Sequence, residues 1–112
     1  MRRSFLYLAP LGVLISFATL ALPASLRAQS DGEKIFTTKC TLCHAADGSG
    51  SSPTGKALKA KDLKSDEVQK ASDEDLTTII TNGKGKMPAF GKKLKPEDIQ
   101  ALVAYVRSLA KK

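Results

Sequence analysis

The feature that most constrains this chain is the pentapeptide Cys40-Thr41-Leu42-Cys43-His44. Two thiols three residues apart lie on one face of a helix, so both can form thioether bonds to the two vinyl groups along one edge of a haem. A histidine directly after the second thiol can then swing beneath the ring as the proximal iron ligand. The motif therefore predicts one covalently attached haem c, bonded to Cys40 and Cys43, with its iron on His44.

The same Cys-x-x-Cys spacing occurs in thiol redox sites, zinc knuckles and structural disulfides. A thiol redox site expects a strand-helix-strand context, and no alternating strand pattern precedes Cys40. A zinc knuckle needs about four Cys or His ligands, whereas the whole chain has two Cys and one His. Haem attachment is the favoured interpretation, and a structural disulfide is the remaining alternative.

Residues 1–28 have the layout of a secretory signal peptide. Two arginines follow Met1, an uncharged apolar run extends from Phe5 to Leu22, and small residues come next. We expect cleavage after Ala28, with Ala24 as the alternative, and a domain of residues 29–112 in the periplasm. The run of 18 residues is long enough for an uncleaved membrane anchor, but its proline and glycine residues disfavour that interpretation.

The remaining 84 residues fit one small domain, whose apolar core would be marginal without added apolar bulk such as haem. Loss of three arginines with the signal lowers Lys+Arg from 18 to 15 against 11 acids, a net charge of +4. Three aromatic residues remain, too few for the basic patch interleaved with aromatics that binds nucleic acid. We expect a monomer that is not embedded in a membrane and does not bind nucleic acid.

Capping residues and apolar periodicity predict an all-α domain. Ser30-x-x-Glu33 has the pattern of a capping box and opens a first helix that carries Phe36, a residue of the core and of the haem wall. Further predictions are a loop over 47–55, one short helix or two turns over 56–70, a helix between Ser72 and Gly83, and a last helix from Pro96.

Met87 is the only methionine after residue 28, and it lies in a segment too rich in Gly and Pro for a helix. A methionine usually fills gaps in a core, but the haem motif makes this one the candidate distal axial ligand. A thioether favours reduced iron, which implies a positive midpoint potential. On the other face of the haem, His44 is expected to donate its second ring N–H to a loop carbonyl, with that of Pro53 as the first candidate.

The haem motif, a Gly-x-x-x-Phe before it, a later Met-Pro and a terminal amphipathic helix with Tyr105 and Arg107 resemble the class I c-type cytochromes. The resemblance covers residues 29–112 and is strongest for small single-haem bacterial and photosynthetic types. It implies three to five helices wrapped around one haem. The first and last helices would cross at Gly32, Phe36, Leu102 and Tyr105.

This resemblance implies an electron carrier and not an enzyme, since iron held by His44 and Met87 has no open position for a substrate. Expected partners are redox proteins with acidic docking faces: a donor of the quinol–cytochrome c reductase type, a terminal oxidase, a peroxidase or a dehydrogenase. Six lysines are candidates for steering them, unless they form only a solvated face: Lys39, Lys56, Lys84, Lys86, Lys92 and Lys93.

Three other functions stay open on the sequence. In a haem enzyme or gas sensor, Met87 would be displaced or never bound. In a thiol–disulfide oxidoreductase, Cys40 and Cys43 would act without haem. The chain would also suit a dedicated subunit of one dehydrogenase. Ala45-Ala46-Asp47 follows His44 where many members of the family have glycine, a departure that we treat as tolerated variation.

Overall fold

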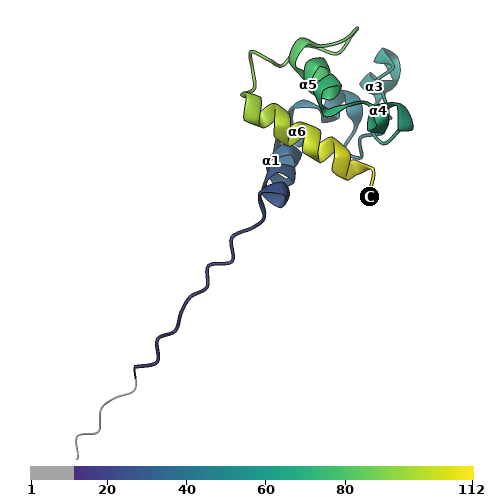
Figure 1. Cartoon of the computed structure of the whole chain (residues 1–112). Coiled ribbons are helices and arrows are strands. Elements are labelled where there is room, and N and C mark those ends of the chain that lie inside the picture. Colours follow the sequence, from purple (N-terminus) through teal and green to yellow (C-terminus); the bar gives the residue numbers. More distant parts are fainter. Residues whose placement is uncertain (1–11) are drawn as a thin grey trace, which may run out of the picture.

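The computed structural model describes residues 12–112, and these form an all-α domain (Figure 1). The helices are α1 (Ala24–Lys39), α2 (Thr41–His44), α3 (Pro53–Leu58), α4 (Asp66–Lys70), α5 (Asp73–Asn82) and α6 (Pro96–Leu109). The described residues thus contain six helical segments against the expected three to five, because α2 and α4 are single turns. The start of the expected signal, residues 1–11, lies outside the described part.

The first helix begins earlier than the sequence predicts. The pattern at Ser30 indicates a helix start there, but α1 begins at Ala24 and Ser30 lies inside it. The intervening residues include Ala, Leu, Arg and Gln, which favour helix, so α1 continues through the expected cleavage point at Ala28. Residues 12–23 precede it as an extended segment that projects from the domain (Figure 1).

Helices α1 and α6 cross at the centre of the domain, as expected (Figure 1). A Cβ at Gly32 would overlap the carbonyl oxygen of Ala101 and lie 2.9 Å from the Cβ of Tyr105, so glycine is what allows the two backbones to approach. One turn further along α1, the rings of Phe36 and Tyr105 pack at a tilt, with centroids 5.1 Å apart.

Helix α6 supplies most of the core. Its buried residues are Ile99, Ala101, Leu102, Val103, Tyr105, Val106 and Leu109. Leu76 and Ile80 of α5 and Val68 of α4 close the same cluster. The helix starts at Pro96, as predicted, although Lys95 in the capping position has no acceptor to offer. The carboxylate of Asp98 compensates, because it accepts the Lys95 N–H at 3.1 Å.

The segment between His44 and α5 contains more helix than expected. The predicted loop 47–55 ends at Ser52, whose hydroxyl accepts the Gly55 N–H at 2.9 Å and caps α3, with Pro53 as its first residue. Lys59, in the left-handed region at φ 56°, ends α3. Helix α4 then forms separately, so the two-turn alternative for residues 56–70 is the correct one.

Helix α5 agrees with its prediction at both ends. The Ser72 hydroxyl accepts the Asp75 N–H at 3.0 Å, and Gly83 ends the helix at φ 74°. Among the described residues, no helix combines the length and the apolar character needed to cross a membrane.

Candidate haem site

The two cysteines lie one helical turn apart, at the point where α1 passes into α2. The Cys40 N–H donates to the Phe36 carbonyl at 2.9 Å, and the Cys40 carbonyl accepts the N–H groups of Cys43 at 3.2 Å and His44 at 2.9 Å. Both thiols are free. This turn therefore presents two thiols and an imidazole in the order that haem attachment requires.

The Cys40 thiol is poorly suited to redox exchange. Burial of its side chain, and then the neighbouring Cys43 thiol, raise the pKa of Cys40 to about 11, against a lowering effect of Lys39. The attacking cysteine of a thiol–disulfide oxidoreductase needs the opposite, a lowered pKa that provides thiolate at neutral pH. This argues against an oxidoreductase that uses the two free thiols.

The loop before α3 and the start of α3 hold the attachment turn in place. The Ser52 hydroxyl lies 2.7 Å from the Leu42 carbonyl oxygen and 3.1 Å from that of Cys43. A Cβ at Gly55 would overlap this same Cys43 oxygen, so only glycine allows α3 to lie so close. These contacts satisfy carbonyls that the short helix α2 leaves without partners.

The His44 ring contacts a different carbonyl from the one expected. Its Nδ1 lies 3.1 Å from the carbonyl oxygen of Lys61, which leaves Nε2 as the nitrogen available for iron. Pro53 is not this partner, because it is the first residue of α3 and its carbonyl points along that helix. Lys61 follows α3 in a segment without regular structure. A role for Pro53 elsewhere around the haem stays a prediction.

Met87 is held by a folded-back segment after α5. Met87 and Lys84 exchange two backbone hydrogen bonds, of 3.0 and 3.1 Å. The chain then returns to the end of α5, where the N–H groups of Phe90 and Gly91 donate to the carbonyls of Ile80 and Thr81, both at 3.0 Å. The predicted non-helical character of this segment is confirmed, and backbone bonds on both sides of Met87 fix its position.

The donor set fits a haem c. Cys40 and Met87, from segments far apart in sequence, both pack against the apolar core cluster. Phe36, which is 2% exposed, belongs to that cluster, as predicted; its contact with haem stays a prediction. Two thiols for attachment, an imidazole and a soft thioether are the groups that c-type haem uses.

Sequence reasoning missed Ser52 and Lys61. The Ser52-Pro53 pair is itself a signal, since serine before proline is typical of a helix start. Lys61 acts through its backbone carbonyl, which every residue type possesses, so its side chain gives no signal.

Comparisons with known proteins agree with this site. Residues 27–106 match the protein family described as cytochrome c oxidase, cbb3-type, subunit III. A cytochrome c6 of Nostoc sp. is 38% identical over 96 residues, which are 86% of this chain and 84% of that protein. A cytochrome c6 of Microcystis aeruginosa is 42% identical over 82 residues, 73% of this chain and 98% of its own length.

A solved structure is also similar. The KustC0563 c-type cytochrome is 37% identical and superposes with a TM-score of 0.65 over 70% of this chain and 96% of its own. Matches in sequence and in fold thus cover most of each relative and include the attachment turn. The chain therefore belongs to the class I c-type cytochromes, electron-transfer proteins with one covalently bound haem c.

Proposed function

We propose that residues 29–112 act as a periplasmic one-electron carrier whose haem is attached through Cys40 and Cys43. His44 and Met87 are its axial iron ligands. The observation that carries the proposal is the packing of Cys40 and Met87 on one apolar core, with the Nδ1 of His44 engaged by a carbonyl and its Nε2 left for iron.

This arrangement suits electron transfer. When bound, haem c supplies an iron that alternates between the ferric and ferrous states. His44 and Met87 would fill both axial positions in each state, so no substrate would enter and no ligand would exchange. The backbone bonds around Met87 and the carbonyl behind His44 keep both ligands in place, which limits the rearrangement that accompanies each electron.

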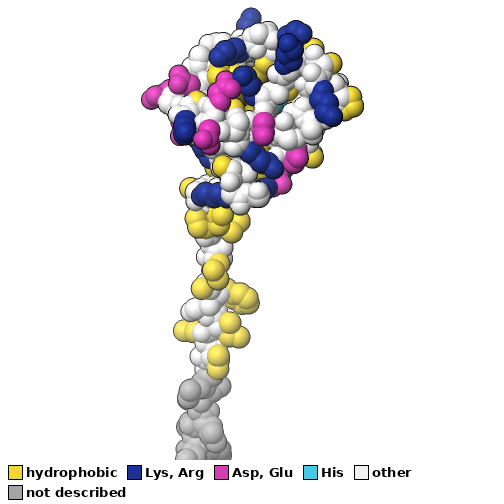
Figure 2. Space-filling view, turned by 90° about the vertical axis from the view of Figure 1, so that its right-hand side faces the viewer, with side chains coloured by type: hydrophobic (Ala, Val, Ile, Leu, Met, Phe, Trp, Pro, Cys, Tyr) yellow, Lys and Arg dark blue, Asp and Glu magenta, His cyan; other side chains and the backbone are white. Residues whose placement is uncertain are grey.

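The N-terminal segment supports export. Apolar side chains line residues 12–22 in Figure 2, and those of Leu14 and Leu20 are 94% and 97% exposed. Such a segment is unfavourable in water and suits a signal that export machinery binds and a peptidase removes. The 82 matched residues of the Microcystis relative are close in length to the proposed domain. The intact mass of the exported protein tests cleavage after Ala28.

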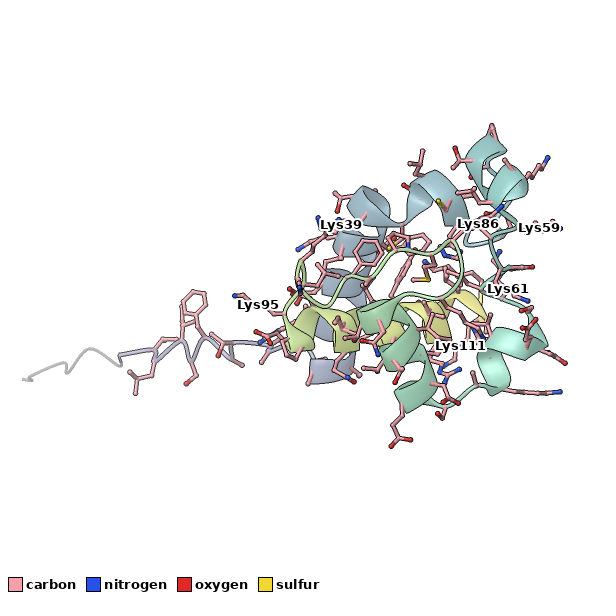
Figure 3. The ribbon with its side chains drawn as sticks, turned by 90° about the horizontal axis from the view of Figure 1, so that it is seen from above. Lys39, Lys59, Lys61, Lys86, Lys95 and Lys111 are labelled. Carbon is pink, nitrogen blue, oxygen red and sulfur yellow. The ribbon has the colours of Figure 1, made fainter. Side chains whose placement is uncertain are left out.

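Unpaired lysines support partners with acidic docking faces. Among the described residues, Lys34, Lys61 and Lys70 form ion pairs. The six proposed docking lysines do not: Lys39, Lys56, Lys84, Lys86, Lys92 and Lys93. Figure 3 shows Lys39, Lys59 and Lys86 along one side of the domain. The Lys93 ammonium lies 5.8 Å from the centre of the Phe90 ring, but none of the six is neutralised by a carboxylate, so their charges remain available to attract an anionic surface.

The deciding experiment is a visible spectrum of the exported protein, ferric and ferrous, with and without CO. We expect haem that resists acidic-solvent extraction, the weak red band of sulfur-ligated ferric iron, and no CO response. Met87→Ala should keep the covalent haem but bind CO, because it opens one axial position. The neighbouring exposed Lys86→Ala is the matched control and should resemble the unmodified protein.

Other outcomes point to other functions. CO binding by the unmodified protein would favour a haem enzyme or sensor. Absence of haem, with maturation factors present, would favour a thiol–disulfide oxidoreductase that uses the free thiols of Cys40 and Cys43. An equal CO response in the Met87→Ala variant and the unmodified protein would remove Met87 from the ligand set.

A dedicated subunit is the second candidate, because the matching family is named for an oxidase subunit. The relatives named cytochrome c6 match over most of their length, which favours a freely diffusing carrier. Size-exclusion chromatography of the protein from its native periplasm separates the two: a carrier elutes alone, and a subunit elutes with its complex.

A further inference from the structure

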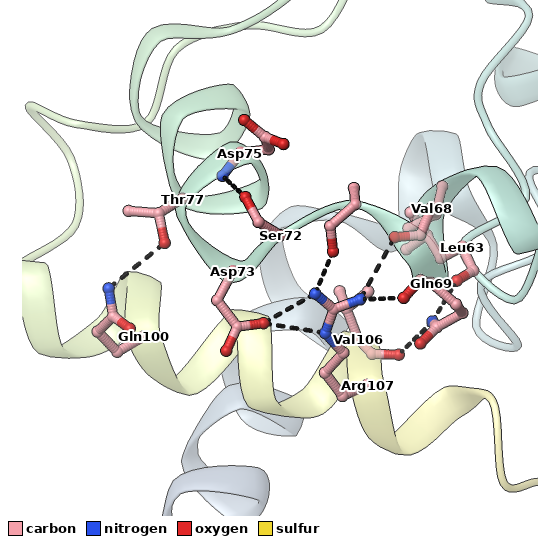
Figure 4. A network of polar contacts seen from close by, with 11 residues as sticks. Leu63, Val68, Gln69, Ser72, Asp73, Asp75, Thr77, Gln100, Val106 and Arg107 are labelled. Carbon is pink, nitrogen blue, oxygen red and sulfur yellow. Dashed lines mark hydrogen bonds and ion pairs between the residues drawn. The ribbon is translucent and has the colours of Figure 1, made fainter.

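Gln69 joins three segments of the domain through one amide group (Figure 4). Its Nε2 lies 2.7 Å from the carbonyl oxygen of Leu63 and 3.0 Å from that of Val106. An amide nitrogen has two N–H donors, so these contacts use its full donor capacity. Val106 lies in the last turn of α6, where carbonyls lack partners within the helix. Gln69 thus ties the segment before α4 to the end of α6.

The segment that Gln69 holds is the one that contacts the His44 ring. Lys61, whose carbonyl oxygen lies 3.1 Å from Nδ1 of His44, is two residues before Leu63. The Leu63 N–H donates to the Gly48 carbonyl at 2.8 Å. Leu63 is therefore fixed on both sides: by Gly48, four residues after the histidine, and by Gln69 from the helical core.

Gln69 is itself held firmly. The guanidinium of Arg107 donates to the Gln69 carbonyl at 2.8 Å and pairs with Asp73 at 2.8 Å (Figure 4). Arg107 is 28% exposed and Asp73 is 70% exposed, so the bond to the Gln69 carbonyl, which joins α6 to the end of α4, is the part-buried one of the two. By contrast, the ion pair between Lys61 and Glu67 is exposed, with side chains 63% and 68% accessible, and such pairs contribute little.

We propose that Gln69 is a positioning residue for His44: it holds the 61–63 segment so that the Lys61 carbonyl stays within hydrogen-bond distance of Nδ1. This inference rests on the proposed ligation of iron by His44. A carbonyl on Nδ1 fixes the orientation of the imidazole and strengthens it as an electron donor to the metal. Loss of the Gln69 amide would let the segment move, weaken this bond and favour ferrous over ferric iron.

The test compares Gln69→Met, which keeps side-chain length but lacks the donors, with two controls in the haem-loaded protein. Gln100→Met removes another amide, which contacts Thr77 at 3.4 Å. Glu67→Gln breaks the exposed ion pair to Lys61. Proton NMR of the ferrous protein gives the exchange rate of the His44 Nδ1–H. We expect it to rise roughly fivefold to tenfold in Gln69→Met, with a higher midpoint potential, and to stay unchanged in both controls.

Exchange rate and potential equal to those of Gln100→Met, in a protein whose spectrum still indicates His/Met ligation, would overturn the inference and leave the proposed function intact. A missing His44 signal in the unmodified protein would instead contradict the proposed function. If Gln69→Met does not accumulate, Gln69→Glu keeps the shape of the side chain but has no N–H donor when ionised. A raised exchange rate in Gln69→Glu, with the rate unchanged in Gln100→Glu, supports the inference, and equal rates in these two variants contradict it.

Discussion

Ala45, directly after the histidine, holds a backbone conformation that suits glycine. Its φ is 60° and its ψ is 165°, a region in which a side chain is strained. The neighbouring contacts explain why the strain persists: the Ala45 N–H donates to Thr41 at 3.0 Å, and the Gly50 N–H reaches the His44 carbonyl at 2.8 Å. Glycine would fit this position without that strain.

Ala45→Gly should therefore stabilise the protein. Relief of strain at a positive φ stabilises the protein by roughly 1–3 kcal/mol. Glycine also has more conformational freedom in the unfolded chain, and this offsets about 0.5–1 kcal/mol of the gain. We expect a net gain of about 1 kcal/mol in the free energy of unfolding, measured by denaturant titration of the haem-loaded protein. Ala46→Gly, next to it without a positive φ, should be neutral or destabilising; equal gains in both would contradict this account.

Residues with distinctive chemistry were predictable from the sequence, and residues that act through the backbone were not. Cys40, Cys43, His44 and Met87 are candidates because few other side chains can attach haem or bind iron. The Lys61 carbonyl depends on where the chain turns after α3, which no local pattern specifies.

Some helix ends were also predictable from the local sequence, and others were not. Ser72, Gly83 and Pro96 mark ends correctly, because capping is a local interaction between neighbours in sequence. The predicted start of α1 at Ser30 was wrong, because the residues of 24–29 also favour helix and extend it toward the N-terminus. Removal of the proposed signal would leave Ser30 near the new helix start, where its capping pattern would operate.

The close approach of α1 and α6 requires glycine at position 32, where a side chain would overlap the opposite backbone. Gly32→Ala should destabilise the protein by about 1–3 kcal/mol, because the new Cβ would overlap the Ala101 carbonyl and a packed backbone yields little. The better helix propensity of alanine, about 1 kcal/mol, offsets only part of this cost. Denaturant titration of the haem-loaded protein gives the change.

Thr38→Ala is the matched control on α1, because Thr38 is exposed and alanine gains helix propensity there without a contact across the crossing. A stabilisation by both substitutions would show that α1 and α6 can separate slightly at no cost. The crossing would then depend on the apolar stripe of α6 and on the packing of Phe36 against Tyr105, and not on Gly32.

The charges of the whole molecule are segregated along the chain. Residues 62–75, which include α4, carry six acidic residues and two lysines, a net charge of −4. Residues 76–96, which include the Met87 segment, carry five lysines and no acid, a net charge of +5. Because the lysine-rich stretch carries Met87, the proposed distal ligand, an anionic partner drawn to it would arrive next to the proposed iron site.

This separation predicts which lysines control the rate of electron transfer. Neutralising Lys84 and Lys86 together, as glutamines, should slow oxidation of the ferrous protein by hexacyanoferrate(III), an anion, by roughly two- to fivefold at low salt. Lys70→Gln should change the rate little, because Lys70 lies in the acidic stretch and pairs with Asp66 at 3.3 Å. Stopped-flow absorbance measures each rate constant.

Salt and the charge of the oxidant separate steering from a local effect on the iron. The difference between the double variant and the unmodified protein should vanish as ionic strength rises to about 1 M, where charges are screened beyond roughly 3 Å. With a cationic cobalt complex as oxidant, the double variant should react faster than the unmodified protein. A slower reaction with both oxidants, at every salt concentration, would mean that the two lysines affect the Met87 segment itself and not the approach of a partner.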